Sequence, residues 1–157
     1  MMGGNLAMNP CPRGDDCTPE EERKYRDRIS QPLLDRIDIF LEIPRMRREA
    51  LRLGQGGDGD TSDQVRERVI AARQRQLHRA GKINAHLNTR EVDRDCILHE
   101  SDQQLLTQAG TRLGLSARAY HRILRLARTI ADLADAESIA TPHLTEALTL
   151  RRLSGRK

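Results

Sequence analysis

Helix start and stop signals alternate at short intervals along the chain from residue 61 onward. Capping residues mark five starts, and glycines mark two ends. The starts are Thr61 with Gln64, Asn88 with Glu91, Ser101 with Gln104, Ser116, and Thr141 with Pro142; the ends are Gly81 and Gly114. Short connections between helices favour antiparallel neighbours, so this part of the sequence predicts a small helical bundle and a mainly α fold.

The predicted helix from Ser116 to about Ala134 has the clearest amphipathic pattern. Its apolar side comprises Tyr120, Ile123, Leu124, Ala127, Ile130, Ala131 and Ala134. Arg118, Arg122 and Arg125 fall on the opposite side, with Arg128 at the margin. A weaker basic stripe, formed by Arg68, Arg75 and Arg79, follows the helix predicted after residue 62. Two interpretations stay open: solvated faces with ion pairs such as Arg128 to Asp132, or contacts with DNA phosphates.

The composition narrows the class of protein. Tyr25, Phe40 and Tyr120 are the only aromatic residues, which favours helices packed through Leu, Ile and Ala over a β-sandwich. The net charge of +4 permits a nucleic acid partner, although 23 acidic residues dilute that signal. The sequence has no apolar stretch of membrane-spanning length, no signal peptide and an odd count of three cysteines. It therefore predicts a cytoplasmic protein without membrane association.

The first part of the chain has a different pattern. Thr18 and Pro19 open a predicted helix that ends near Ile29. In the segment 37–43, the apolar residues Ile37, Ile39, Leu41 and Ile43 alternate with Asp38, Phe40 and Glu42, which predicts a half-buried strand. The glycine-rich stretch GQGGDGDTS, at 54–62, indicates a linker. We expect residues 1–17 and 45–62 to be poorly ordered, and 63–153 to form the stable unit.

Three stretches together resemble one family. They are MNPCPRG, RISQPLLDRIDIFLEIPR and LGLSARAYHRILRLARTIADL, which occur in the order found in the C-terminal part of magnesium-chelatase-like AAA+ ATPases, in particular the ComM/YifB competence group. The resemblance runs from about Ala7 to Leu153. It implies that residues 1–44 are the end of an AAA+ core, 45–62 a flexible linker and 63–157 a helical lid. It also implies a hexameric ATP-driven motor that acts on branched or recombining DNA.

The resemblance assigns roles to three residues. Arg36 matches the arginine finger, which stabilises charge on the γ-phosphate of ATP in the neighbouring subunit, with Asp35 and Asp38 holding it extended. Asn9 matches the sensor 1 position, which orients the attacking water. Arg118 matches the sensor 2 position, which contacts the ATP phosphates. From the residues alone, the favoured interpretations are that Arg36 is a salt-bridged loop arginine, Asn9 a turn residue and Arg118 part of a solvated stripe.

Several departures from the family limit what this chain is expected to do. The sequence contains no G-x-x-x-x-G-K-[ST] and no Walker B carboxylate, so we expect no ATP hydrolysis by the chain alone. ATP and Mg²⁺ are expected only in a complete ring, with an AAA+ core or neighbouring subunits as partners. Arg13 replaces a family cysteine, which leaves Cys11 and Cys17 and predicts no metal site. Gln31 replaces a family glycine in the segment that leads to Arg36, and glutamine tolerates fewer backbone conformations than glycine.

Two alternatives to an ATPase fragment stay open. One is a stand-alone basic helical module that binds DNA through Arg122, Arg125, Arg68, Arg75 and Arg79. The other is a degenerate, truncated gene product that keeps the fold of the lid because its caps and apolar faces agree with each other.

Overall fold

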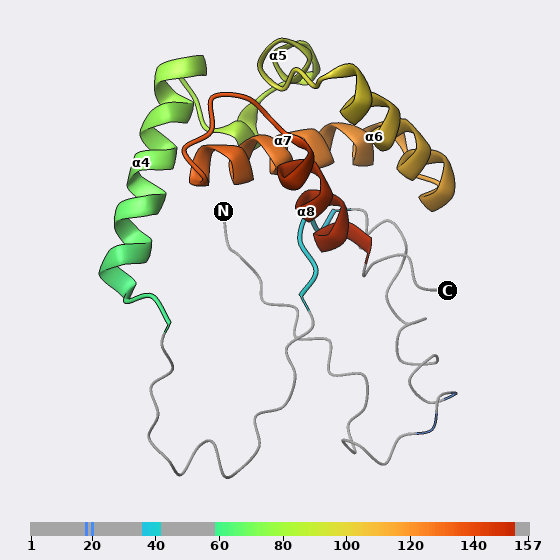
Figure 1. Cartoon of the computed structure of the whole chain (residues 1–157), viewed down its shortest axis with the longest axis horizontal. Helices are drawn as coiled ribbons and strands as arrows, with labels where there is room; N and C mark the ends of the chain where they lie inside the picture. The colour runs from blue at the N-terminus through green and yellow to red at the C-terminus, as the bar shows by residue number, and fades with distance from the viewer. Residues whose placement is uncertain (1–17, 19, 21–35, 42–58, 153–157) are drawn as a thin grey trace. The chain divides into compact units, whose positions relative to one another are not determined.

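The structure is a computed structural model that describes residues 18, 20, 36–41 and 59–152. The chain divides into two compact units, residues 1–37 and 38–157. Nearly all the described residues belong to the second unit, whose helices are shown in Figure 1. They are α4 (Ser62–Ala80), the short 3-10 helix η2 (Asn84–His86), α5 (Thr89–Asp95), α6 (Glu100–Leu113), α7 (Ala117–Leu133) and α8 (Thr141–Arg152). The predicted mainly α fold is confirmed.

Most predicted helix ends are also confirmed. The backbone N–H of Gln64 donates to Thr61 Oγ1, and Gln64 Oε1 accepts from the Thr61 N–H at 2.8 Å, which forms the capping box of α4. Asn88 and Glu91 form the same box at the start of α5. Ser116 caps α7. The short helix η2 was not predicted from the sequence.

The predicted start of α6 at Ser101 is wrong, because the helix begins at Glu100 after His99. The first turn contains a tertiary hydrogen bond, in which Thr141 Oγ1 donates to the buried Asp102 carboxylate at 2.6 Å. This bond ties the start of α6 to the start of α8. The hydroxyl of Thr141 is therefore used between helices, and His143 Nδ1 accepts the backbone N–H of Ala140 at the start of α8.

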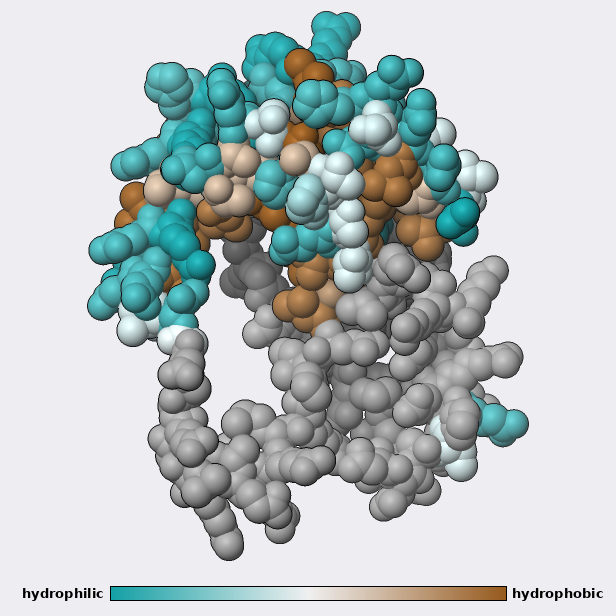
Figure 2. All heavy atoms as spheres, viewed as in Figure 1, coloured by the Kyte–Doolittle hydropathy of each residue, from teal (hydrophilic) through white to brown (hydrophobic). Residues whose placement is uncertain are grey.

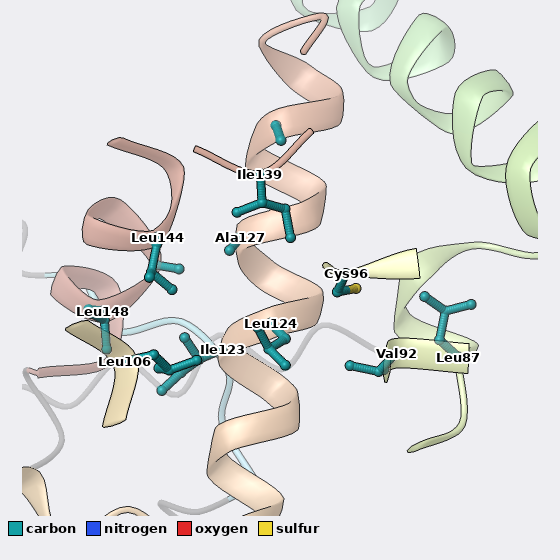
Figure 3. Packing of buried hydrophobic residues seen from close by; sticks show 12 residues of the cluster. Leu87, Val92, Cys96, Leu106, Ile123, Leu124, Ala127, Ile139, Leu144 and Leu148 are labelled. Carbon is teal, nitrogen blue, oxygen red and sulfur yellow. The ribbon is translucent and has the colours of Figure 1, made fainter. Parts of the chain in front are cut away.

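Helix α7 is the centre of the bundle. Figure 3 shows Leu144 and Leu148 of α8 on one side of α7, and Leu87, Val92 and Cys96 on the other. The apolar face predicted for α7 is confirmed at Ile123, Leu124, Ala127 and Ala131, all of them buried. Ala134 is exposed at the end of the helix, and Arg128, predicted at the margin of the basic face, is buried. On the face that Figure 2 shows, the described residues present many hydrophilic side chains with smaller hydrophobic areas between them.

The strand predicted over 37–43 is not formed within its described residues, 37–41, and the predicted inward face is wrong. Phe40 is only 8% exposed, whereas Ile39 and Leu41 are 47% and 69% exposed. The backbone N–H of Phe40 donates to the carbonyl oxygen of Leu150 in α8 at 2.9 Å. Its backbone partner is therefore the end of a helix and not a second strand. Residues 42 and 43, the rest of the helix predicted from Thr18 to Ile29, residues 1–17 and residues 45–58 of the linker lie outside the described residues.

Two glycines allow a matched pair of substitutions by alanine, one at a helix end and one inside a helix. Gly81 ends α4 with a φ of +66°, a left-handed conformation, whereas Gly110 lies inside α6; a Cβ added at either position meets no atom within 4 Å. Replacing Gly81 by alanine is expected to lower the free energy of unfolding by about 1–2 kcal/mol, because the left-handed conformation disfavours a side chain. Replacing Gly110 by alanine is expected to raise it by about 0.5–1 kcal/mol. Urea unfolding of both variants measures these changes, and equal shifts would contradict the prediction.

Candidate phosphate-binding cleft

An open cleft of about 410 Å³ lies beside the first turns of α7. Its lining comes from the start of α5 and from one face of α7: Thr89, Ala117, Arg118, His121, Arg122 and Arg125. Because Arg118, Arg122 and Arg125 are spaced four and three residues apart, the α-helical repeat places them on the same face. The capped start of α7 brings the positive end of the helix dipole to the same place.

The side chains of two of these arginines have no hydrogen-bond or ion-pair partner among the described residues. Arg118 is exposed at the start of α7. Arg125 is half-buried, and its Nε atom is buried without a hydrogen-bond partner. A buried, unsatisfied donor is unfavourable, so an acceptor that reaches Arg125 gains more than it would at a fully solvated side chain.

Arg122 is held by an acidic residue from a distant part of the sequence. Its Nη1 atom lies 3.1 Å from Oδ1 of Asp38, and the two side chains are 16% and 58% exposed. Asp38 was predicted to hold Arg36 extended, but the ion pair that the structure gives it is with Arg122. No local sequence signal connects these two residues, so the pair was not foreseen.

His121 lies between the arginines on the same face. Its Nδ1 atom is 2.8 Å from the carbonyl oxygen of Ala117, and its Nε2 atom is 4.0 Å from the Asp93 carboxylate. Because a carbonyl oxygen only accepts hydrogen bonds, Nδ1 carries the hydrogen in this contact. His121 follows Arg118 by three residues, a helical spacing that is the sequence signal for its place beside the arginines.

The arginines of the second stripe are engaged with acidic groups. Arg68 pairs with Asp60. Arg75 pairs with Asp135 and also donates to the carbonyl oxygen of Asp132 at 2.9 Å. Arg79 donates from both terminal nitrogens to the two carboxylate oxygens of Asp132, each at 2.8 Å. These contacts support the interpretation of ion-paired faces, and DNA binding by the stripe stays an untested prediction.

Asp132 is the centre of a buried polar network. The amide of Asn84 donates to its carboxylate at 2.8 Å, and Arg128, 3% exposed, donates to it at 3.1 Å and also to the carbonyl oxygens of Ala136 and Glu137. The predicted ion pair between Arg128 and Asp132 is thus confirmed. Burial raises the pKa of Asp132, but hydrogen bonds from Arg79 and Asn84, together with the positive charges of Arg128 and Arg79, outweigh it and keep the pKa below its ordinary value.

An open hollow of about 580 Å³ lies beside this network and is lined by both basic and acidic side chains: Gln74, Arg75, His78, Arg79, Asp132, Ala136 and Glu137. Its arginines already pair with Asp132 and Asp135, so it offers less positive potential than the cleft at α7. Cys96 lies in the core, where burial raises the pKa of its thiol to about 11 and keeps it protonated at neutral pH.

Of the remaining predicted site residues, Arg36 and Asn9, the structure describes only Arg36. Arg36 is exposed in a turn, and Asn9, Cys11, Cys17 and the Arg13 substitution lie outside the described residues. Within the described ranges, no group of three or more potential metal ligands is found, and the prediction of no metal site stays a prediction. None of the described helices is long and apolar enough to cross a membrane.

Comparisons with known proteins assign the helical bundle that contains the basic cleft to a family. The model of the magnesium chelatase subunit ChlI C-terminal family matches residues 59–151, which contain the whole cleft, and that of magnesium chelatase subunit ChlI matches residues 5–51. The chain therefore belongs to the magnesium chelatase subunit ChlI C-terminal family.

Particular relatives agree with this assignment. The chain is 46% identical to competence protein ComM of Haemophilus influenzae over 153 residues, and 42% and 40% identical to YifB of Salmonella typhimurium and of Escherichia coli. Each match covers 94% of this chain and 30% of the relative. The chain thus spans about a third of the length of these curated relatives.

Proposed function

We propose that this chain is the helical lid, with the end of the ATPase core, of a ComM-like AAA+ motor that remodels DNA in a ring. Arg118 contacts the phosphates of ATP as sensor 2. Arg36 acts on ATP bound to the neighbouring subunit, and Asn9 positions the attacking water as sensor 1. ATP and Mg²⁺ are held by the part of the motor that carries the Walker motifs, so this chain alone does not hydrolyse ATP.

The observation that carries this proposal is the basic cleft at the start of α7. Arg118 is exposed, has no partner among the described residues and shares the cleft with Arg122 and Arg125. A guanidinium stays charged at physiological pH and donates two parallel hydrogen bonds to phosphate oxygens, and the positive helix end adds to its attraction. The identity to ComM over 94% of the chain supports the same assignment.

The proposal predicts that Arg118→Ala lowers ATP hydrolysis by a chimera in which this chain replaces the matching segment of Haemophilus influenzae ComM. A lost charged hydrogen bond to phosphate corresponds to a fall in kcat/KM of about ten- to a hundredfold. Steady-state phosphate release measures the fall. Arg90→Ala is the matched control, because Arg90 is exposed on α5 near the cleft without lining it. Equal losses for both variants, or no hydrolysis by the unaltered chimera, would count against the proposal.

A stand-alone DNA-binding module is the second candidate function. It is favoured by the same three cleft arginines and by the net charge of +4. Binding of this kind weakens steeply with salt, because each phosphate contact releases counterions. Salt-sensitive binding of labelled duplex DNA by the 157-residue chain, lost on Arg125→Ala, would favour this function over nucleotide sensing.

A further inference from the structure

We propose that Asp38 is a tethered competitor for phosphate, which occupies Arg122 of the cleft until the phosphates of a nucleotide displace it. The inference rests on the proposed function, because it concerns regulation of the same cleft. Asp38 is then a positioning residue: it leaves Arg122 only when phosphate occupies the cleft.

The ion pair between Asp38 and Arg122 has the geometry that competition requires. Arg122 lines the cleft, and its charged end lies 3.1 Å from the Asp38 carboxylate, the distance at which a phosphate oxygen would bind. The Asp38 side chain is 58% exposed and has water to move into, whereas that of Arg122 is 16% exposed and is largely fixed. Displacement therefore moves the acid and leaves the arginine in place.

A nearby anchor keeps Asp38 available. Phe40 is buried, and its backbone N–H donates to the carbonyl oxygen of Leu150. Asp38 is only two residues from this anchor, so it is held at a high effective concentration near Arg122 even after it has been displaced. The competitor therefore returns when phosphate leaves.

The balance between the two anions favours a polyphosphate. Asp38 pairs with one cleft arginine, and a solvated ion pair of this kind is weak. A triphosphate has enough charge to contact Arg118 and Arg125 as well, whose side chains have no partner among the described residues. His121 and Thr89 also line the cleft, and Asp93 lies 4.0 Å from His121 as the second acidic group nearby.

Displacement of Asp38 has a consequence for the segment that carries it. Arg36, the candidate arginine finger, precedes Asp38 by two positions in the sequence. An occupied cleft releases Asp38, and the backbone between Asp38 and the finger then loses one of its restraints. Nucleotide in the cleft of one subunit thereby changes the freedom of the finger that this subunit offers to its neighbour.

The experiment is a titration of the full 157-residue chain with inorganic triphosphate at low ionic strength, followed through the NMR signals of the arginine Nε–H groups. Asp38→Asn is expected to tighten triphosphate binding about two- to fivefold, because the competitor is neutralised. Asp93→Asn is the matched control: it removes the same charge beside the cleft but leaves Arg122 paired, and is expected to change the affinity by less than about 1.5-fold.

A double substitution separates competition from general electrostatics. In an Arg122→Gln background, Asp38→Asn is expected to give no tightening, because there is no longer an arginine to release. A gain that persists without Arg122, or equal gains for Asp38→Asn and Asp93→Asn, would overturn the inference. If Arg118→Ala weakens binding while Asp38→Asn changes nothing, the inference fails and the proposed function stands. If millimolar triphosphate shifts none of the cleft arginine signals, both fail.

Discussion

Replacing Arg36 by alanine is expected to lower ATP turnover by about three to five orders of magnitude in the ComM chimera that contains this chain. Phosphoryl transfer spreads negative charge over the phosphate oxygens, and a planar guanidinium stabilises two of them at once. Arg36 is exposed and follows directly after Asp35 in the sequence. An exposed arginine is accessible to a neighbouring subunit, as action on that subunit's ATP requires.

Mixing experiments distinguish a finger that acts on the neighbour from a residue that supports its own subunit. Chimeras with and without Arg36→Ala are combined in varying proportion, and phosphate release is measured. Action across the interface predicts that each altered chain silences the site next to it, so activity depends on the arrangement of chains in mixed rings. Arg66→Ala is the control, because Arg66 is an exposed α4 residue paired with Asp63. A loss of less than about tenfold on Arg36→Ala would refute the finger assignment.

Replacing Asp132 by asparagine is expected to lower the free energy of unfolding by about 3–5 kcal/mol, because it leaves buried positive charge uncompensated. Asp132 is fully buried, Arg128 is 3% exposed, and Arg79 also donates to its carboxylate. An amide retains part of the hydrogen bonding but none of the charge. Because the network joins α4 to α7, the loss is expected to affect the cooperative unfolding of the bundle.

Urea unfolding monitored by circular dichroism measures this loss. Asp93→Asn is the control, because the Asp93 side chain is 65% exposed, and its effect is expected to stay within about 0.5 kcal/mol. Similar effects of the two substitutions would show that the buried network contributes little to stability.

The pH dependence of stability gives an independent measurement of the same group. The pKa of Asp132 is lower in the folded protein than its ordinary value of 3.8, so the unfolded chain takes up the proton first as the pH falls. The stabilisation is therefore present above about pH 4 and is lost as the pH falls through the folded pKa. Asp132→Asn is expected to flatten this acid limb of the stability curve, and an unchanged limb would assign acid unfolding to other carboxylates.

The candidate cleft was predictable from the sequence only in part. The helical spacing of Arg118, Arg122 and Arg125 placed them on one face, and the family resemblance singled out Arg118. The spacing did not show that Arg122 is already paired or that Arg125 has a buried, unpartnered Nε. Both facts depend on which chain segment lies next to α7, and that choice is made by tertiary packing.

The sequence by itself determined the helices of the bundle and most of their ends. Capping at Thr61, Asn88 and Ser116 involves hydrogen bonds to residues three positions away, so the signal and its partner lie in one short stretch. Tertiary structure decided the burial of Phe40, the partner of Asp102, and the contacts of Asp132 with Arg79 and Asn84. These features depend on groups from other segments of the chain, which come close only when the apolar faces pack against one another. A local sequence pattern cannot predict that packing.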